Sequence, residues 1–378
     1  EIVSQMIIHR IELKRISGHL KELDGLRGLA ISLVIFFHLF PYFQLSKLGW
    51  VGVDLFFVLS GFLITGILID TSDTKHYWRN FFIRRILRIF PLYYLTLILF
   101  ILLAESSDDF RTNPVVNYAY FSENQVWFWL YLSNIKMFIE GEWLPSLIFN
   151  PFWSLSIEEQ FYIFWPLFIY NLKGRNLAIV IVSLVVGGIL VRIFLVTMNY
   201  SSLSIYVFTF SRLDAILLGS LISLMVRVEK WRIYLEHSVP VIFVLALSGL
   251  LGIAVVNKSF NPYLESLQLY GYTLIAIFFS ALLLITISNN KLNIKHVFQN
   301  PFLVFMGKYS YALYIFHWPL YLLLNDPLKK ILTIYFSNNT VVELGVSFVA
   351  LIFTILASLF TWNLFEKHFI KLKSVLSK

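Results

Sequence analysis

The chain has 378 residues, of which 58% are hydrophobic and only 14% are charged. Soluble domains carry roughly a quarter charged residues, so this composition excludes an ordinary soluble domain and indicates an integral membrane protein. The formal net charge is +8, and the absence of cysteine excludes disulfides and thiolate metal sites. We expect no metal cofactor.

Ten apolar segments approach the roughly 20 residues that a helix needs to cross a bilayer. They lie near 28–44, 50–70, 83–104, 152–171, 177–197, 205–226, 239–256, 268–288, 301–324 and 341–364. A further apolar stretch, 126–139, is short and is interrupted by Asn134 and Lys136. The sequence therefore predicts an all-α fold, a polytopic membrane helix bundle of about ten transmembrane helices plus one short interfacial or re-entrant segment. Aromatic residues near the segment ends fit the belts found at bilayer interfaces.

The positions of Lys and Arg predict the orientation of these helices. With ten spans and the N-terminus inside, most basic residues fall in the inner loops, as the positive-inside rule requires. We expect a multi-pass cell-membrane protein with both termini cytoplasmic. It would have an N-terminal segment (1–22), one transmembrane domain (23–366) and a short basic tail (367–378). The positive charge then reflects topology and contact with membrane lipid, so we expect no nucleic-acid partner and, from the first residues, no signal peptide.

The first span carries two ionisable side chains on nearly one face. Arg27 and His38 are 11 positions apart, which is about 20° from three whole helical turns and roughly 16 Å along the axis. Ionisable groups at such depth are costly and usually face the protein interior or a wet cavity. Imidazole suits proton transfer near neutral pH, so His38 is either a general base or a structural histidine bonded to a neighbouring helix.

Three arginines, Arg84, Arg85 and Arg88, lie at the start of the third span. Guanidinium groups bind phosphate through two parallel hydrogen bonds, so these residues are candidate contacts for a phosphorylated cofactor. The alternative is an anchor on anionic lipid headgroups. Pro91 is expected to kink the helix one turn further in and to open space around the arginines.

Two adjacent carboxylates, Glu158 and Glu159, lie at the start of the fourth span, which this topology places at the outer side, opposite the arginines. Ser156-x-x-Glu159 matches a capping box, which favours a structural role for Glu159. Glu158 has no such role, and we expect it to point into the bundle. His317 lies well inside the ninth span, where a scaffold role and a catalytic role are equally open.

The second span contains a buried acid and several small residues. Asp54 needs a partner at that depth, and either His38 or an arginine would serve. The neighbouring Gly52, Ser60 and Gly61 predict close packing against another helix.

Five of these stretches, in this order, resemble the acyltransferase-3 family of integral-membrane acyltransferases, which modify cell-surface glycans and related small molecules. They are "LDGLRGLAISLVIFFH", "VGVDLFFVLSGFLIT", "FFIRRILRIFPLYYL", "FWSLSIEEQFYIFWP" and "YSYALYIFHWPL", within about 22–365. The resemblance implies an O-acyltransferase with cytosolic acyl-CoA, in the first place acetyl-CoA, as co-substrate. The acceptor would be a hydroxyl of a glycan or a small molecule. Many relatives carry a fused extracytoplasmic hydrolase-like domain, which we do not expect in this sequence.

The resemblance also implies roles for individual residues. The family's R-x10-H motif falls on Arg27 and His38, with His38 catalytic, and its R-x-x-R phosphate contact falls on Arg85 and Arg88. With the residue chemistry, this predicts that acyl-CoA is held by Arg27, Arg84, Arg85 and Arg88.

The catalytic centre is expected around His38, either as general base or as carrier of the acyl group. Glu158 or Asp54 would orient its ring. The extended arm of acyl-CoA would pass Arg27 along the first span to reach it.

Two other classes of function stay open. Buried His, Asp and Arg also occur in transporters, such as an exporter of glycans or small molecules, and a membrane scaffold would explain the span count alone. The identity of the acyl group and of the acceptor, and the state of the protein as monomer or homo-oligomer, are open as well.

Overall fold

The computed structural model describes residues 20–288 and 294–376, so the predicted N-terminal segment lies outside the described residues as far as residue 19. Within these ranges the regular structure is helical, with no strand. The predicted all-α class is confirmed.

The first half of the chain forms the following helices. They are α2 (Lys21–Leu39), the 3-10 helix η1 (Gln44–Val51), α3 (Gly52–Thr71), α4 (Tyr77–Ser106), α5 (Asp108–Arg111), α6 (Tyr118–Trp129), α7 (Ser133–Glu140), the 3-10 helix η2 (Leu147–Phe149), α8 (Phe152–Asn171) and α9 (Gly174–Thr197).

The second half continues in the same way. Its helices are α10 (Ser202–Val207), α11 (Thr209–Met225), α12 (Glu229–Asn257), the π-helix η3 (Leu267–Gly271), α13 (Tyr272–Ile287), α14 (Lys295–Phe298), α15 (Pro301–Lys308), α16 (Ser310–Tyr335), α17 (Asn339–Thr361), the π-helix η4 (Trp362–Glu366) and α18 (Lys367–Leu376).

Each of the ten predicted spans coincides with one of these helices or with two consecutive ones. Seven segments of the described chain are long and apolar enough to cross a membrane; they begin at Gln44, Tyr77, Gly174, Ser202, Glu229, Leu267 and Asn339. The remaining three predicted spans are α2, α8 and the α15–α16 pair. These three carry Arg27 and His38, the adjacent Glu158 and Glu159, and His317. The polytopic bundle is therefore confirmed, with ten as an approximate count.

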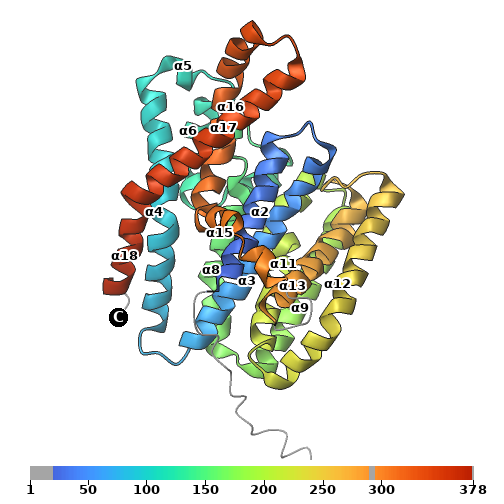
Figure 1. Ribbon diagram of the computed structural model, residues 1–378. Coiled ribbons are helices and arrows are strands. Elements are labelled where there is room, and N and C mark those ends of the chain that lie inside the picture. The colour runs from blue at the N-terminus through green and yellow to red at the C-terminus, as the bar shows by residue number, and fades with distance from the viewer. Residues whose placement is uncertain (1–19, 289–293, 377–378) are drawn as a thin grey trace, which may run out of the picture.

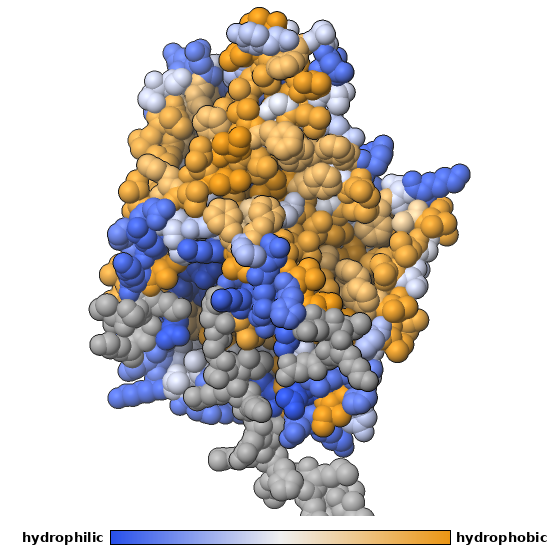
Figure 2. Space-filling view, in the orientation of Figure 1, coloured by the Kyte–Doolittle hydropathy of each residue, from blue (hydrophilic) through white to orange (hydrophobic). Residues whose placement is uncertain are grey.

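The helices differ strongly in how far they are covered by the rest of the bundle. In its most apolar window, the segment containing α3 is 78% buried, whereas the corresponding window of α12 is 17% buried. In Figure 1, α3 lies in the middle of the molecule and α12 at its edge. Hydrophobic residues cover most of the middle and upper parts of the same face in Figure 2, while hydrophilic residues lie at its upper edge and gather toward its lower end. This is the surface that a membrane-embedded bundle needs, with an apolar belt and a polar end.

Small residues set the tightest helix crossings. A Cβ atom at Gly61 of α3 would lie 1.8 Å from the carbonyl oxygen of Ile216, and one at Gly219 of α11 would lie 2.0 Å from that of Val58. Side chains larger than hydrogen cannot occupy these positions unless the two backbones separate. The close packing predicted from the small residues of the second span is confirmed.

The stretch at 126–139 is divided between two short helices, α6 and α7, as expected for a segment that does not span. Asn134 is fully buried in α7, and its side-chain amide donates to the Thr209 hydroxyl at 2.8 Å. The polar residue that interrupts the apolar run is therefore part of the packing between α7 and α11.

Two local predictions were wrong. Helix α8 begins at Phe152, one turn before Ser156, whose hydroxyl donates to the Phe152 carbonyl instead of capping a helix end. Helix α4 begins at Tyr77, so Arg85 lies roughly 12 Å along the helix instead of at its entrance. The basic run lowers the local hydropathy and made the span look shorter than the helix is.

Candidate active site

The two motif residues of α2 line two neighbouring cavities. Arg27 lines a cavity of about 90 Å³, which we call the arginine cavity, together with Arg85 and Arg88 of α4. His38 lines a second cavity of about 300 Å³. Val53 and Tyr314 line both, so they form the partition between the two spaces.

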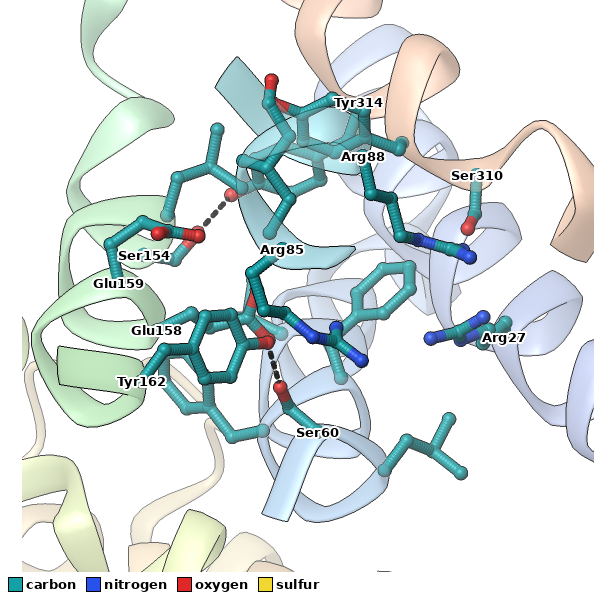
Figure 3. A pocket seen from close by; sticks show the side chains of 17 residues that line it. Arg27, Ser60, Arg85, Arg88, Ser154, Glu158, Glu159, Tyr162, Ser310 and Tyr314 are labelled. Carbon is teal, nitrogen blue, oxygen red and sulfur yellow. Dashed lines mark hydrogen bonds between the residues drawn. The ribbon is translucent and has the colours of Figure 1, made fainter. Parts of the chain in front are cut away.

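Three guanidinium groups converge in the arginine cavity (Figure 3). Arg27 reaches it from α2, and Arg85 and Arg88 reach it from α4. Within the described ranges, none of the three lies within 4.0 Å of a carboxylate oxygen. Arg88 is exposed, so this cluster is accessible from outside the packed core. Arg84, the third arginine of the predicted group, does not line the cavity.

Helix α8 forms the facing wall of the same cavity. Glu158 and Glu159 both line it, and Tyr162 shares a short hydrogen bond with the Ser60 hydroxyl of α3. The Arg85 guanidinium lies 5.5 Å from the centre of the Tyr162 ring. The expectation that Glu158 lies opposite the arginines was wrong, because both α4 and α8 bring these groups to the middle of the bundle.

The second cavity has a strongly aromatic wall. We call it the aromatic chamber; besides His38, Val53 and Tyr314 it is lined by Trp50, Trp143, Trp153, Trp318, Tyr206, Tyr263, Phe37, Val34, Leu147, Asn150, Pro151 and Pro262. Many of these residues come from the connections that follow α2, α7 and α12. No Asp, Glu, Lys or Arg is among them.

His38 contacts a second histidine. The Nδ1 atom of His38 lies 3.2 Å from Nε2 of His317 and 3.0 Å from the Val34 carbonyl oxygen. The Nδ1 atom of His317 lies 2.7 Å from the Tyr314 carbonyl oxygen and 3.2 Å from that of Leu313.

These contacts assign the protons of both rings. A carbonyl oxygen can only accept, so Nδ1 of His317 carries its proton, and in the neutral ring Nε2 accepts. Nδ1 of His38 then donates to Nε2 of His317, which leaves Nε2 of His38 unprotonated. Nε2 has no hydrogen-bond partner within the described part of the chain. His38 therefore presents an unprotonated nitrogen, and its ring is held by a fully buried His317.

Asp54 lies elsewhere. Its carboxylate accepts from Arg212 at 2.6 Å, and both side chains are 1% exposed. The group that contacts the His38 ring is thus His317, from the ninth predicted span, and not the carboxylate of Asp54 or Glu158. Sequence reasoning missed Tyr314 and Tyr162, although Tyr314 precedes His317 by three positions and therefore lies on the same helical face.

Comparison with known proteins gives a consistent result. The sequence model described as an acyltransferase domain, that of the acyltransferase-3 family, matches residues 20–362. No solved structure matches.

Several curated bacterial proteins are similar over most of the chain. It is 30% identical over 330 residues to "Putative peptidoglycan O-acetyltransferase YrhL" of Bacillus subtilis, covering 83% of this chain and 50% of that protein. It is 28% identical over 326 residues to "Peptidoglycan O-acetyltransferase OatA" of Listeria monocytogenes, covering 83% and 51%. The chain thus spans about half the length of these relatives. The matched range contains every residue that lines the two cavities, and the chain belongs to the acyltransferase-3 family.

Proposed function

We propose that this protein is an O-acetyltransferase that moves an acetyl group from cytosolic acetyl-CoA to a hydroxyl of a cell-wall glycan. The names of the relatives supply the acceptor class, since they are peptidoglycan O-acetyltransferases. The observation that carries the proposal is the convergence of three unpaired guanidinium groups in a cavity that shares a wall with the cavity of His38.

The arginine cavity suits the phosphate-bearing end of acyl-CoA. Arg27, Arg85 and Arg88 offer planar donors that match phosphate oxygens, and they do so without a carboxylate competing at contact distance. A cavity of about 150 Å³ holds one benzene molecule, so a space of about 90 Å³ has no room for the adenine ring. The nucleotide then stays at the mouth near the exposed Arg88, and only the slender pantetheine arm passes inward.

The thioester reaches His38 past the partition of Val53 and Tyr314. Nε2 of His38 takes the proton of the acceptor hydroxyl, whose oxygen attacks the thioester carbonyl carbon. The new C–O bond forms, the C–S bond breaks, and the proton passes from His38 to the leaving thiolate. In an alternative mechanism, Nε2 of His38 first accepts the acetyl group and then passes it to the hydroxyl. This mechanism uses the same residues and the same positions of the two substrates.

His317 acts as a positioning residue in this scheme. Its Nε2 accepts from Nδ1 of His38 and so keeps the proton away from the reacting nitrogen. This is the role that the sequence assigned to a carboxylate.

The orientation in the membrane is part of the proposal. We place both termini and the mouth of the arginine cavity on the cytoplasmic side, where acyl-CoA is found, because the positive-inside rule favours it. The chain has no cysteine, so single cysteines introduced at the exposed Leu45 and Leu376 can be labelled with an impermeant maleimide in intact cells. Labelling is expected at Leu45 alone, and labelling at Leu376 would reverse the orientation.

The decisive test is His38→Ala in purified protein. Acetyl transfer is expected to fall by about 10²–10⁴-fold, while acetyl-CoA binding and thermal stability are kept. The matched control is His237→Ala, because His237 lies exposed on α12 and its ring bonds only its own helix at Ile233. Normal turnover by His38→Ala would refute the mechanism, and transfer that requires a transmembrane gradient would favour a transporter.

A further inference from the structure

We propose that the aromatic chamber is the acceptor subsite, where a pyranose ring of the glycan stacks on tryptophan faces, with Trp143 at the rim. The inference rests on the proposed acetyl transfer to a glycan and adds where and how the acceptor binds. It follows from three properties of the chamber, namely its charge, its available surfaces and its size.

The two cavities differ in charge in a way that separates two substrates. The arginine cavity contains three arginines and two glutamates, whereas the aromatic chamber contains no side chain of these types. A phosphorylated donor is therefore matched by the first space and not by the second. The part of a ligand that enters the chamber should therefore be uncharged.

The chamber offers a ligand aromatic ring faces, while the indole N–H groups of three of its tryptophans are already hydrogen-bonded. The indole N–H groups of Trp50, Trp143 and Trp318 donate to the Phe260 carbonyl, the Tyr263 hydroxyl and the Leu147 carbonyl, at 3.0, 3.1 and 3.0 Å. With their edges bonded, these indoles are fixed in orientation and offer their apolar faces. The axial C–H groups of a pyranose form a flat apolar face of the same kind, and its hydroxyls project from the edge toward the half-buried rim at Trp143 and Trp318.

The size of the chamber fits one substituted sugar ring. At about 300 Å³ it is twice the roughly 150 Å³ that accommodates benzene. An acetyl group alone would leave most of this space empty. His38 lies on the wall, with its ring centre 5.0 Å from that of Trp318, so a hydroxyl of a stacked sugar ring would lie close to the His38 ring.

Binding can be measured without any acetyl donor, which separates this inference from the proposed function. The probe is the β-1,4-linked pentamer of N-acetylglucosamine, titrated into the full chain in detergent by calorimetry. Trp143→Ala is expected to weaken binding about tenfold, and Trp143→Phe, which keeps a ring face, by less than threefold. Trp78→Ala is the control, because Trp78 is an exposed tryptophan outside both cavities.

A second measurement covers the case in which Trp143→Ala does not fold. Saturation transfer from the aromatic protons of the unsubstituted protein should reach the ring protons of the pentamer. Absence of pentamer binding, unchanged affinity in a folded Trp143→Ala, or transfer confined to the N-acetyl methyl groups would each overturn the subsite. Weakened acetyl-CoA binding in Trp143→Ala would assign the chamber to the donor and overturn it as well. If the unsubstituted protein binds the pentamer but does not transfer acetyl from acetyl-CoA, the result counts against the proposed function and not against the subsite.

Discussion

Two groups of arginines in this bundle are used in opposite ways. Arg192, Arg212 and Arg227 each contact an aspartate, at 2.7, 2.6 and 2.8 Å. Arg27, Arg85 and Arg88 lie at a cavity, and none has a carboxylate within 4.0 Å in the described ranges.

The paired group connects helices. Arg192 of α9 bonds Asp214 of α11, Arg212 of α11 bonds Asp54 of α3, and Arg227 bonds Asp70 through two nitrogens. The two charges of each pair depend on one another, because burying one charge without the other is costly. The cavity arginines have no such partner in the described ranges, and we propose that a bound ligand supplies the negative charge. The comparison therefore separates arginines that are paired within the fold from arginines that we propose bind a substrate.

The largest expected effect comes from removing one charge of a buried pair. Asp54→Asn keeps the shape of the side chain but leaves Arg212 charged, fully buried and without its counter-ion. The expected loss of unfolding free energy is about 3–5 kcal/mol, measured by thermal or denaturant unfolding in detergent.

The double variant Asp54→Leu with Arg212→Met is its matched control. Removing both charges should restore much of the lost stability, because no unpaired charge remains buried. If stability returns and acetyl transfer does not, the Asp54–Arg212 pair has a role in the reaction besides its effect on stability. If Asp54→Asn is as stable as the unsubstituted protein, the division of the arginines into two groups does not hold.

A smaller effect, on a different quantity, is expected for the unpaired group. Arg85→Gln should leave the unfolding free energy nearly unchanged and weaken acetyl-CoA binding by about 1.5–3 kcal/mol, the contribution of a hydrogen bond to a charged group. Equilibrium binding of acetyl-CoA measures this directly, with Arg232→Gln on the surface of α12 as control. Unchanged donor affinity together with weaker lipid association would make Arg85 a headgroup anchor.

The sequence predicted the helices well because span length and hydropathy are local properties. Each of the ten predicted spans falls on one helix or on two consecutive helices, and Gly61 indicated a close crossing before its partner was known. Helix ends were less predictable where polar residues begin a helix, as in α4, which starts at Tyr77 and not near residue 83.

The sequence indicated individual residues of the candidate site, but it did not indicate which of them contact each other. His38 and Arg27 could be identified from their spacing on one helix, but His317 is 279 positions from His38, and one sequence carries no record of that contact. The same holds for Asp54, whose partner lies 158 positions away. The sequence assigned the tryptophans of the chamber to an interfacial belt. Belt and cavity tryptophans have the same sequence pattern, and only the folded connections between the helices distinguish them.

The smallest effect is expected for an ion pair of similar length that is exposed to solvent. Lys173 and Asp73 are 2.9 Å apart, and their side chains are 66% and 86% exposed. Lys173→Gln should change the unfolding free energy by at most about 1 kcal/mol, and raising the salt concentration should reduce even that, because water and ions screen exposed charges. Comparing Lys173→Gln with Asp54→Asn in the same detergent shows whether the loss of unfolding free energy depends on the burial of the ion pair or on the distance between its charges. A loss at Lys173→Gln as large as that at Asp54→Asn would mean that burial is not what makes the paired arginines structural.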